Sequence, residues 1–218
     1  MLKTRIIGVL VVRKDIVVQS IGFHSYLPVG IPWIAIEYLD RWGIDEIVVL
    51  DIDATPENRS PRFDYIAQYS QYCHVPLSIG GGIRTVEDVT KAVHAGADKV
   101  VINTAAVENP RLITEAAQRF GIQCIVVSID AKRKQNGTYE VFIRSGKQAT
   151  GLSPAALAQR AEEYGAGEIF INSIDRDGSK KGYDMELVNA VVKAVKIPVV
   201  ICGGVGKPSD LLEGMKDN

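Results

Sequence analysis

GIDEIVVLDID, at Gly43–Asp53, recurs at an offset of 122 residues as GAGEIFINSID at Gly165–Asp175. The same offset relates Pro76–Val89 (PLSIGGGIRTVEDV) to Pro198–Leu211 (PVVICGGVGKPSDL). Each segment contains a run rich in Val and Ile that lacks strict alternation, which is typical of a parallel strand buried on both faces. The chain therefore has two related halves, at about residues 1–120 and 121–218.

Strand and helix signals alternate along the whole chain. Thr85–Asp88 resembles a capping box, and Asn109-Pro110 and Ser153-Pro154 each place an N-cap residue before a first-turn proline. Glycines follow the predicted helices as C-terminal stops at Gly43, Gly96, Gly121 and Gly165. The predicted strands are Ile6–Val12, Glu46–Asp51, Leu77–Ile79, Lys99–Ile102, Cys124–Asp130, Glu168–Asn172 and Pro198–Cys202. Because crossovers between parallel strands are right-handed, the pattern predicts an α/β fold, a (β/α)8 TIM barrel that forms a single domain over residues 1–218.

The offset also indicates which part of such a barrel is missing. Asn218 corresponds to Gly96, just before the fourth predicted strand, so no counterpart of that strand follows in the sequence. Barrels of this kind need about 250 residues. We therefore expect the eighth strand unit to be absent and interpret the sequence as part of a longer chain, with genuine truncation as the alternative.

Two stretches interrupt the alternation of strands and helices. Arg13–Ile31 is predicted to be a long loop, and Lys132–Gly151 contains Asn136-Gly137 between β-prone segments, which predicts a hairpin. Both stretches follow the C-terminal ends of predicted strands. In a barrel those ends form the catalytic rim, so both stretches are expected there.

The bulk composition excludes several classes of function. A net charge of −1 argues against nucleic-acid binding, and no apolar run approaches the roughly 20 residues of a membrane span. The first ten residues read as a strand rather than a signal peptide, so we expect a cytoplasmic protein that binds no membrane. Cys73, Cys124 and Cys202 are too scattered for a disulfide framework or a zinc site, and we expect no metal and no cofactor.

Glycines follow predicted strands at corresponding places in the two halves. Glycine lets backbone N–H groups approach an anion closely, although tight turns alone also favour it. Because the glycines recur, they predict a small-molecule ligand with a phosphate at each end. The residues expected at these two sites are Gly81, Gly82, Asn103 and Thr104, and Asp177, Gly178, Gly203 and Gly204.

Carboxylates also gather at the predicted strand ends, where they could perform general acid–base chemistry, cap a helix or form a loop ion pair. Asp130 differs from the others because it closes an apolar run, IVVSID, whose surroundings favour a raised carboxyl pKa. It is the candidate catalytic residue. At an offset of 119 residues its counterpart in the first half is Val11, which carries no acid.

Charged residues open four of the predicted strands: Arg5, Glu46, Lys99 and Glu168. These strand starts meet at the barrel floor, so the four side chains could form one ring of alternating charge around the axis. Ordinary polar capping of the floor is the alternative.

These features together resemble the cyclase subunit of imidazole glycerol phosphate synthase. The resemblance is carried by GIDEIVVLDI, GADKVVINTAAVENP, VVSIDAKR, SIDRDG and the glycine motifs, between residues 5 and 207. It implies a barrel that receives ammonia from a glutaminase subunit docked at its floor. It further implies that Arg5, Glu46, Lys99 and Glu168 form a gate on the ammonia channel, and that the two glycine sites bind phosphate.

The sequence departs from that family at the chemistry itself. The resemblance implies two catalytic acids, at the positions of Val11 and Asp130, and only the second is kept. Gln19 stands where a lysine is expected, and Asp53 stands at a threonine-type position. Losing one acid–base partner costs about 10²–10⁴ in rate.

The pattern resembles paralogues that pair with a glutaminase and hand ammonia to a separate amidotransferase, which acts on a nucleotide sugar for surface polysaccharides. The authentic histidine-pathway cyclase, with a shifted acid such as Asp53, is the main alternative. The isomerase of the same pathway would not need the gate residues, and a non-catalytic phosphate-binding assembly subunit is a further alternative. Gene neighbourhood would separate these interpretations.

Overall fold

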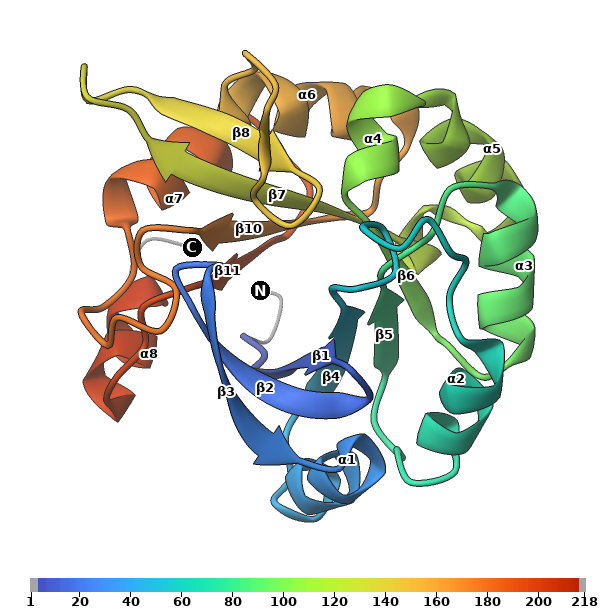
Figure 1. Cartoon of the computed structure of the whole chain (residues 1–218). Coiled ribbons are helices and arrows are strands. Elements are labelled where there is room, and N and C mark those ends of the chain that lie inside the picture. Colours follow the sequence, from blue (N-terminus) through green and yellow to red (C-terminus); the bar gives the residue numbers. More distant parts are fainter. Residues whose placement is uncertain (1–3, 216–218) are drawn as a thin grey trace.

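A parallel barrel sheet ringed by helices is the core of the structure, a computed structural model that describes residues 4–215 (Figure 1). Neighbouring strands pair in the order β11-β10-β7-β6-β5-β4-β1. These parallel strands are β1 (Ile7–Arg13), β4 (Glu46–Asp51), β5 (Leu77–Gly80), β6 (Lys99–Ile102), β7 (Ile125–Arg133), β10 (Glu168–Ser173) and β11 (Val199–Cys202). The barrel prediction is therefore confirmed. Within residues 4–215, β11 pairs only with β10, so the sheet is open between β11 and β1.

The helices lie outside the curled sheet, one after most parallel strands, as Figure 1 shows. They are α1 (Pro32–Arg41), α2 (Phe63–Ser70), α3 (Val86–His94), α4 (Thr104–Glu108), α5 (Arg111–Phe120), α6 (Pro154–Tyr164), α7 (Met185–Val192) and α8 (Pro208–Gly214), with a 3-10 turn at Ile122–Cys124. None of the helices that the structure describes is long and apolar enough to cross a membrane.

Most predicted helix ends agree with the structure. Thr85 and Asp88 form the capping box of α3, and the Ser153 side chain accepts from the Ala156 N–H at the start of α6. Gly165 ends α6 in a left-handed conformation with φ +100°. The prediction for Asn109 is wrong. Asn109 is the C-cap residue of α4, and Pro110 takes the N-cap position of α5 that was predicted for Asn109.

The duplication is preserved in the strand pairing. β4 and β10, like β5 and β11, begin and end at positions that differ by 122 residues. β1 pairs with β4 so that Val11 lies opposite Leu50, and β7 pairs with β10 so that Asp130 lies opposite Asn172. Val11 and Asp130 differ by the 119-residue offset, and their partners Leu50 and Asn172 differ by the 122-residue offset. Val11 and Asp130 therefore occupy equivalent places in the two halves.

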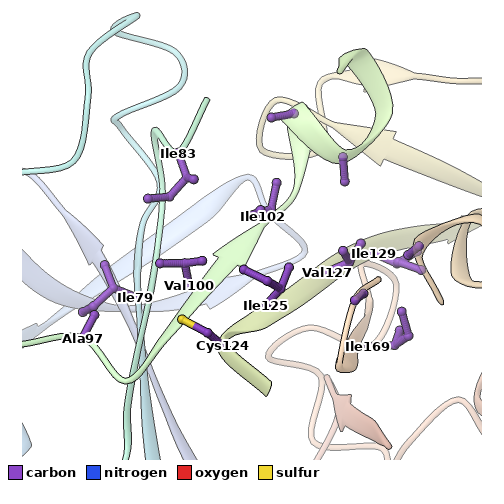
Figure 2. Close-up of a cluster of buried hydrophobic side chains, with 14 of the residues drawn as sticks. Ile79, Ile83, Ala97, Val100, Ile102, Cys124, Ile125, Val127, Ile129 and Ile169 are labelled. Carbon is purple, nitrogen blue, oxygen red and sulfur yellow. The ribbon is translucent and has the colours of Figure 1, made fainter. Parts of the chain in front are cut away.

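Each parallel strand buries side chains on both faces. In β7, Ile125, Val127 and Ile129 point outward and pack with residues of β5, β6 and β10 in the core between sheet and helices (Figure 2). The intervening Val126 belongs to a second cluster with Val48, Val101 and Phe170. Because successive strand residues face opposite sides, this second cluster fills the barrel interior.

A hairpin occupies most of the stretch predicted to be a long loop at Arg13–Ile31, and this correction matters for the site. β2 (Ile16–Ile21) pairs antiparallel with both β1 and β3 (Ser25–Gly30). Lys14 and Asp15 connect β1 to β2 with φ +48° and +65°, as a two-residue turn of type I′ requires. The loop prediction failed because the turn at Lys14 and Asp15 contains neither Asn nor Gly, the residues that mark such turns in a sequence. Val17 and Val18 are buried, as expected for residues of a strand.

The hairpin predicted around Asn136-Gly137 is confirmed. β7 extends to Arg133 and pairs antiparallel with β8 (Tyr139–Ile143), which in turn pairs with the short β9 (Gln148–Ala149). A hairpin thus follows the first strand of each half.

Candidate functional site

A cavity of about 590 Å³ opens at the C-terminal ends of the parallel strands. Every residue that the sequence singled out for phosphate binding lines it, and so do Asp130, Val11 and Gln19. The structure therefore brings both glycine loops and the candidate catalytic acid into one space. The residues of the two predicted phosphate sites on its wall are Gly81, Gly82, Asn103, Thr104, Asp177, Gly178, Gly203 and Gly204.

The wall of the cavity differs between the two halves of the chain. The first half contributes apolar side chains, including Val9, Val11 and Leu50. The second half contributes Ser128, Asp130 and Asn172 from β7 and β10. The loops and the β2–β3 hairpin of the first half add polar side chains such as Gln19, Arg84 and Asn103, but the first-half position equivalent to Asp130 offers only the hydrocarbon surface of Val11.

Asp130 is buried at the polar side of the cavity, with 9% of the residue exposed. Burial raises its pKa to about 7 because water no longer stabilises the charged carboxylate, and the charge of Asp177 acts in the same direction. The Asn103 amide donates to the Asp130 carboxylate at 3.1 Å and opposes the rise. A carboxyl group with this pKa can give or accept a proton near neutral pH.

Asp53 has a structural task that explains its presence. Its carboxylate accepts from the Lys14 N–H at 2.7 Å in the turn between β1 and β2, and it does not line the cavity. Its counterpart Asp175 accepts from the Arg133 N–H at 2.8 Å beside the other hairpin. Both acids therefore anchor hairpins. Asp53 does not lie where it could replace the carboxylate that is absent at Val11.

The first glycine loop requires glycine for steric reasons. Gly81 has φ +106°, and a Cβ atom there would lie 2.2 Å from the Asp51 carbonyl oxygen. Asp51 is itself occupied, because it forms an ion pair with Arg59 at 2.8 Å. The Thr104 hydroxyl accepts a hydrogen bond from the Arg144 N–H at 3.1 Å. Thr104, which was predicted to bind phosphate, therefore already has a partner within the protein.

Two arginines beside this loop were missed in the sequence. Arg84 and Arg144 both line the cavity. Arg84 directly follows the GGGI motif, so its position in the sequence could have identified it as a candidate. Arg144 lies beyond a hairpin, and only the folded chain shows that it reaches Thr104.

The second glycine site is partly covered by the β2–β3 hairpin. The Asp177 carboxylate accepts from the Ser20 hydroxyl at 2.6 Å and from the Phe23 N–H at 3.2 Å. Gly178 has φ +66°, and a Cβ atom there would lie 2.5 Å from the Ser20 carbonyl oxygen. Asp177 thus joins the hairpin to the rim, a contact that spans the two halves.

At the opposite end of the barrel, the structure brings the four floor charges together. Lys99 donates to both Glu46 and Glu168 at 2.9 Å, and Arg5 also pairs with both glutamates. The Ser78 hydroxyl, which the sequence did not single out, donates to Glu46 at 2.8 Å. The result is a closed ring of two cations and two anions.

Metal-binding chemistry is a separate question. Among residues 4–215, His, Cys, Asp and Glu side chains nowhere form groups of three or more that could hold a metal ion.

Comparison with known protein families agrees with the geometry. A family model described as "Histidine biosynthesis protein" matches residues 5–218, which is nearly the whole chain. The match includes both halves of the barrel, the cavity and the charged ring. The chain belongs to the histidine biosynthesis protein family.

Proposed function

We propose that this chain is a cyclase-type subunit of a glutamine amidotransferase that delivers ammonia but has lost the cyclisation chemistry. A glutaminase subunit docked at the barrel floor supplies the ammonia. The ring of Arg5, Glu46, Lys99 and Glu168 gates its entry. Membership of the family supports a cyclase-type role, and the intact ring at the floor supports ammonia entry.

The observation that carries the proposal is the unequal pair at the cavity. Val11 and Asp130 are equivalent in strand register, yet only Asp130 can exchange a proton. Because Asp53 is bonded to the β1–β2 turn, it does not replace the missing acid. A reaction that needs an acid and a base on opposite sides of its substrate therefore lacks one of them, at a cost of about 10²–10⁴ in rate.

The ammonia then needs another acceptor. We propose a separate amidotransferase that acts on a nucleotide-sugar precursor of surface polysaccharide, as in the paralogues that the sequence resembles. In this proposal the cavity binds a phosphorylated small molecule at its glycine loops.

Authentic cyclase activity in histidine biosynthesis is the second candidate function. The retained Asp130 favours it, because a buried carboxyl group with a pKa of about 7 is suited to acid–base catalysis. The two candidates differ in whether one acid is sufficient.

An ammonia-dependent cyclase assay on the full chain tests this difference. We expect wild type near background, Val11→Asp slightly above it, and Val11→Asp with Gln19→Lys higher still, because the double change adds an acid on β1 and a cation on β2. Leu50→Asp is the matched control, since it adds a carboxylate on the neighbouring strand directly opposite Val11 and so tests whether the exact position matters. Wild-type turnover within tenfold of the usual enzyme range of about 1–10³ per second would overturn the proposal in favour of the second candidate.

Co-expression with a glutaminase subunit tests ammonia delivery. We expect the two chains to co-purify and the barrel to raise glutamine turnover. Glu168→Gln should weaken this stimulation, whereas Glu87→Gln, on the outer face of α3, should leave it unchanged. A glutaminase that neither binds the barrel nor responds to it would contradict this part of the proposal.

A further inference from the structure

Arg84 lies at the first glycine loop. Within residues 4–215, its guanidinium forms no ion pair with a carboxylate. Its guanidinium donates to the side-chain and backbone oxygens of Asn58, which is neutral. Both residues line the cavity beside Gly82. The half-buried guanidinium therefore keeps its full attraction for an anion in the cavity.

Arg144 reaches the same site from the loop after β8. Arg144, Ser145 and Gly146 have consecutive left-handed conformations, with φ +55°, +57° and +76°. The loop is held in place because the Arg144 N–H donates to Thr104 and the Ser145 hydroxyl donates to the Ile52 carbonyl oxygen at 3.1 Å. Non-glycine residues persist in this conformation only where their surroundings fix them, so the position of Arg144 is preset.

The Arg144 guanidinium has a weak competitor in the free protein. It pairs with Glu108 at 2.6 Å, and both side chains are more than two-fifths exposed. Glu108 also lines the cavity, on the helix that begins at Thr104. An exposed ion pair of this kind contributes only about 0–1 kcal/mol, so a better anion can displace the glutamate.

We infer that Arg84 and Arg144 together bind the doubly charged phosphate group of a ligand at the first glycine loop, and that Glu108 holds Arg144 until that phosphate arrives. Each arginine comes from a different strand-end loop of the site. A phosphate group presents three strong acceptor oxygens, whereas a carboxylate presents two. A phosphate is therefore a better partner than a carboxylate for two guanidinium groups at once. The inference rests on the phosphate-binding part of the proposed function and adds the side chains that determine the affinity and charge preference of that site.

Inorganic phosphate is the probe, and isothermal titration on the full chain is the measurement. We expect Arg84→Gln and Arg144→Gln each to weaken binding about tenfold, because each removes charge-assisted hydrogen bonds. Lys147→Gln removes an equal charge from the same loop outside the cavity, and we expect less than about a twofold effect because water and salt screen it. The second glycine site is common to all variants, so differences among them report on the first.

Glu108→Gln provides a gain that misfolding cannot imitate. Freeing Arg144 from its partner should tighten phosphate binding about two- to fivefold. Glu57→Gln is the control, since it removes a rim carboxylate that pairs with Arg59 outside the cavity. The inference is overturned if Glu108→Gln binds phosphate no more tightly than Glu57→Gln, or if both arginine variants match Lys147→Gln. No ammonia, glutaminase or acceptor enters this assay, so its failure leaves ammonia delivery untouched.

Discussion

Asp130 shows how the position of a residue on a buried strand sets its chemistry. Its backbone belongs to a fully buried stretch of β7, while its carboxyl group borders a cavity large enough for a small molecule. Burial favours the neutral acid, and the Asn103 amide favours the charged form. The balance holds the group near its midpoint at neutral pH, where it is most useful for proton transfer.

The raised pKa of Asp130 predicts a pH-dependent effect of Asp130→Asn. Because the folded state holds the proton up to about pH 7 and the unfolded chain releases it near 3.8, wild-type stability falls as pH rises between these values. The asparagine variant lacks this loss. We therefore expect it to gain about 2–3 kcal/mol relative to wild type between pH 5 and pH 8, measured by urea unfolding. Asp64→Asn, an exposed carboxyl on α2, should show no such gain, and equal behaviour of the two variants would refute the prediction.

For single residues, the sequence predicted which side chains line the cavity better than it predicted their partners. The apolar run before Asp130 and the glycine motifs identified residues that do line the cavity. Arg144 and the bond between Asp177 and Ser20 were missed because each depends on which loops meet across the rim. Such contacts join residues far apart in the chain and leave no local pattern.

Among the elements, the paired hairpins are the least predictable feature. The turn after β7 carries Asn136-Gly137 and was foreseen, whereas the turn after β1 uses Lys14 and Asp15. The parallel strands and the caps at Thr85 and Ser153 were predicted because periodicity and capping chemistry are local, whereas the cap at Asn109 was not. The β2 strand was missed because turn residues with positive φ other than Gly or Asn give a weak signal.

The equivalent anchors of these hairpins predict similar and independent losses of stability. Asp53→Ala and Asp175→Ala each remove one carboxylate-to-backbone hydrogen bond, of 2.7 and 2.8 Å. Asp53→Ala also removes an ion pair with Arg13 at 3.8 Å, whose exposed setting makes it worth only about 0–1 kcal/mol. Each should cost about 1–2 kcal/mol in free energy of unfolding. Since the two acids share no partner, the double variant should equal the sum within about 0.5 kcal/mol. Urea titrations measure all three, and a loss confined to one half would show that the duplication is not energetically equivalent.

On the scale of the whole molecule, the charged ring joins both halves at the barrel floor. Glu46 and Glu168 are repeat counterparts, and Arg5 and Lys99 each pair with both of them. Glu46 is 1% exposed and Glu168 is 6% exposed, so neither can exchange its protein partners for water without movement. The ring that we propose as an ammonia gate is thus built from groups that are costly to separate.

Breaking the ring at Glu46 should therefore destabilise the whole barrel. Glu46→Gln leaves two cations facing one anion in a buried setting, and we expect a loss of about 3 kcal/mol in free energy of unfolding. The loss should persist at 1 M salt, because screening acts weakly on buried charges. Glu87→Gln, in the exposed pair with Lys91, should cost less than about 0.5 kcal/mol and lose even that at high salt. If the two variants behaved alike, the ring would be solvated enough to open at no cost, and a gate at this floor would need a partner subunit to close it.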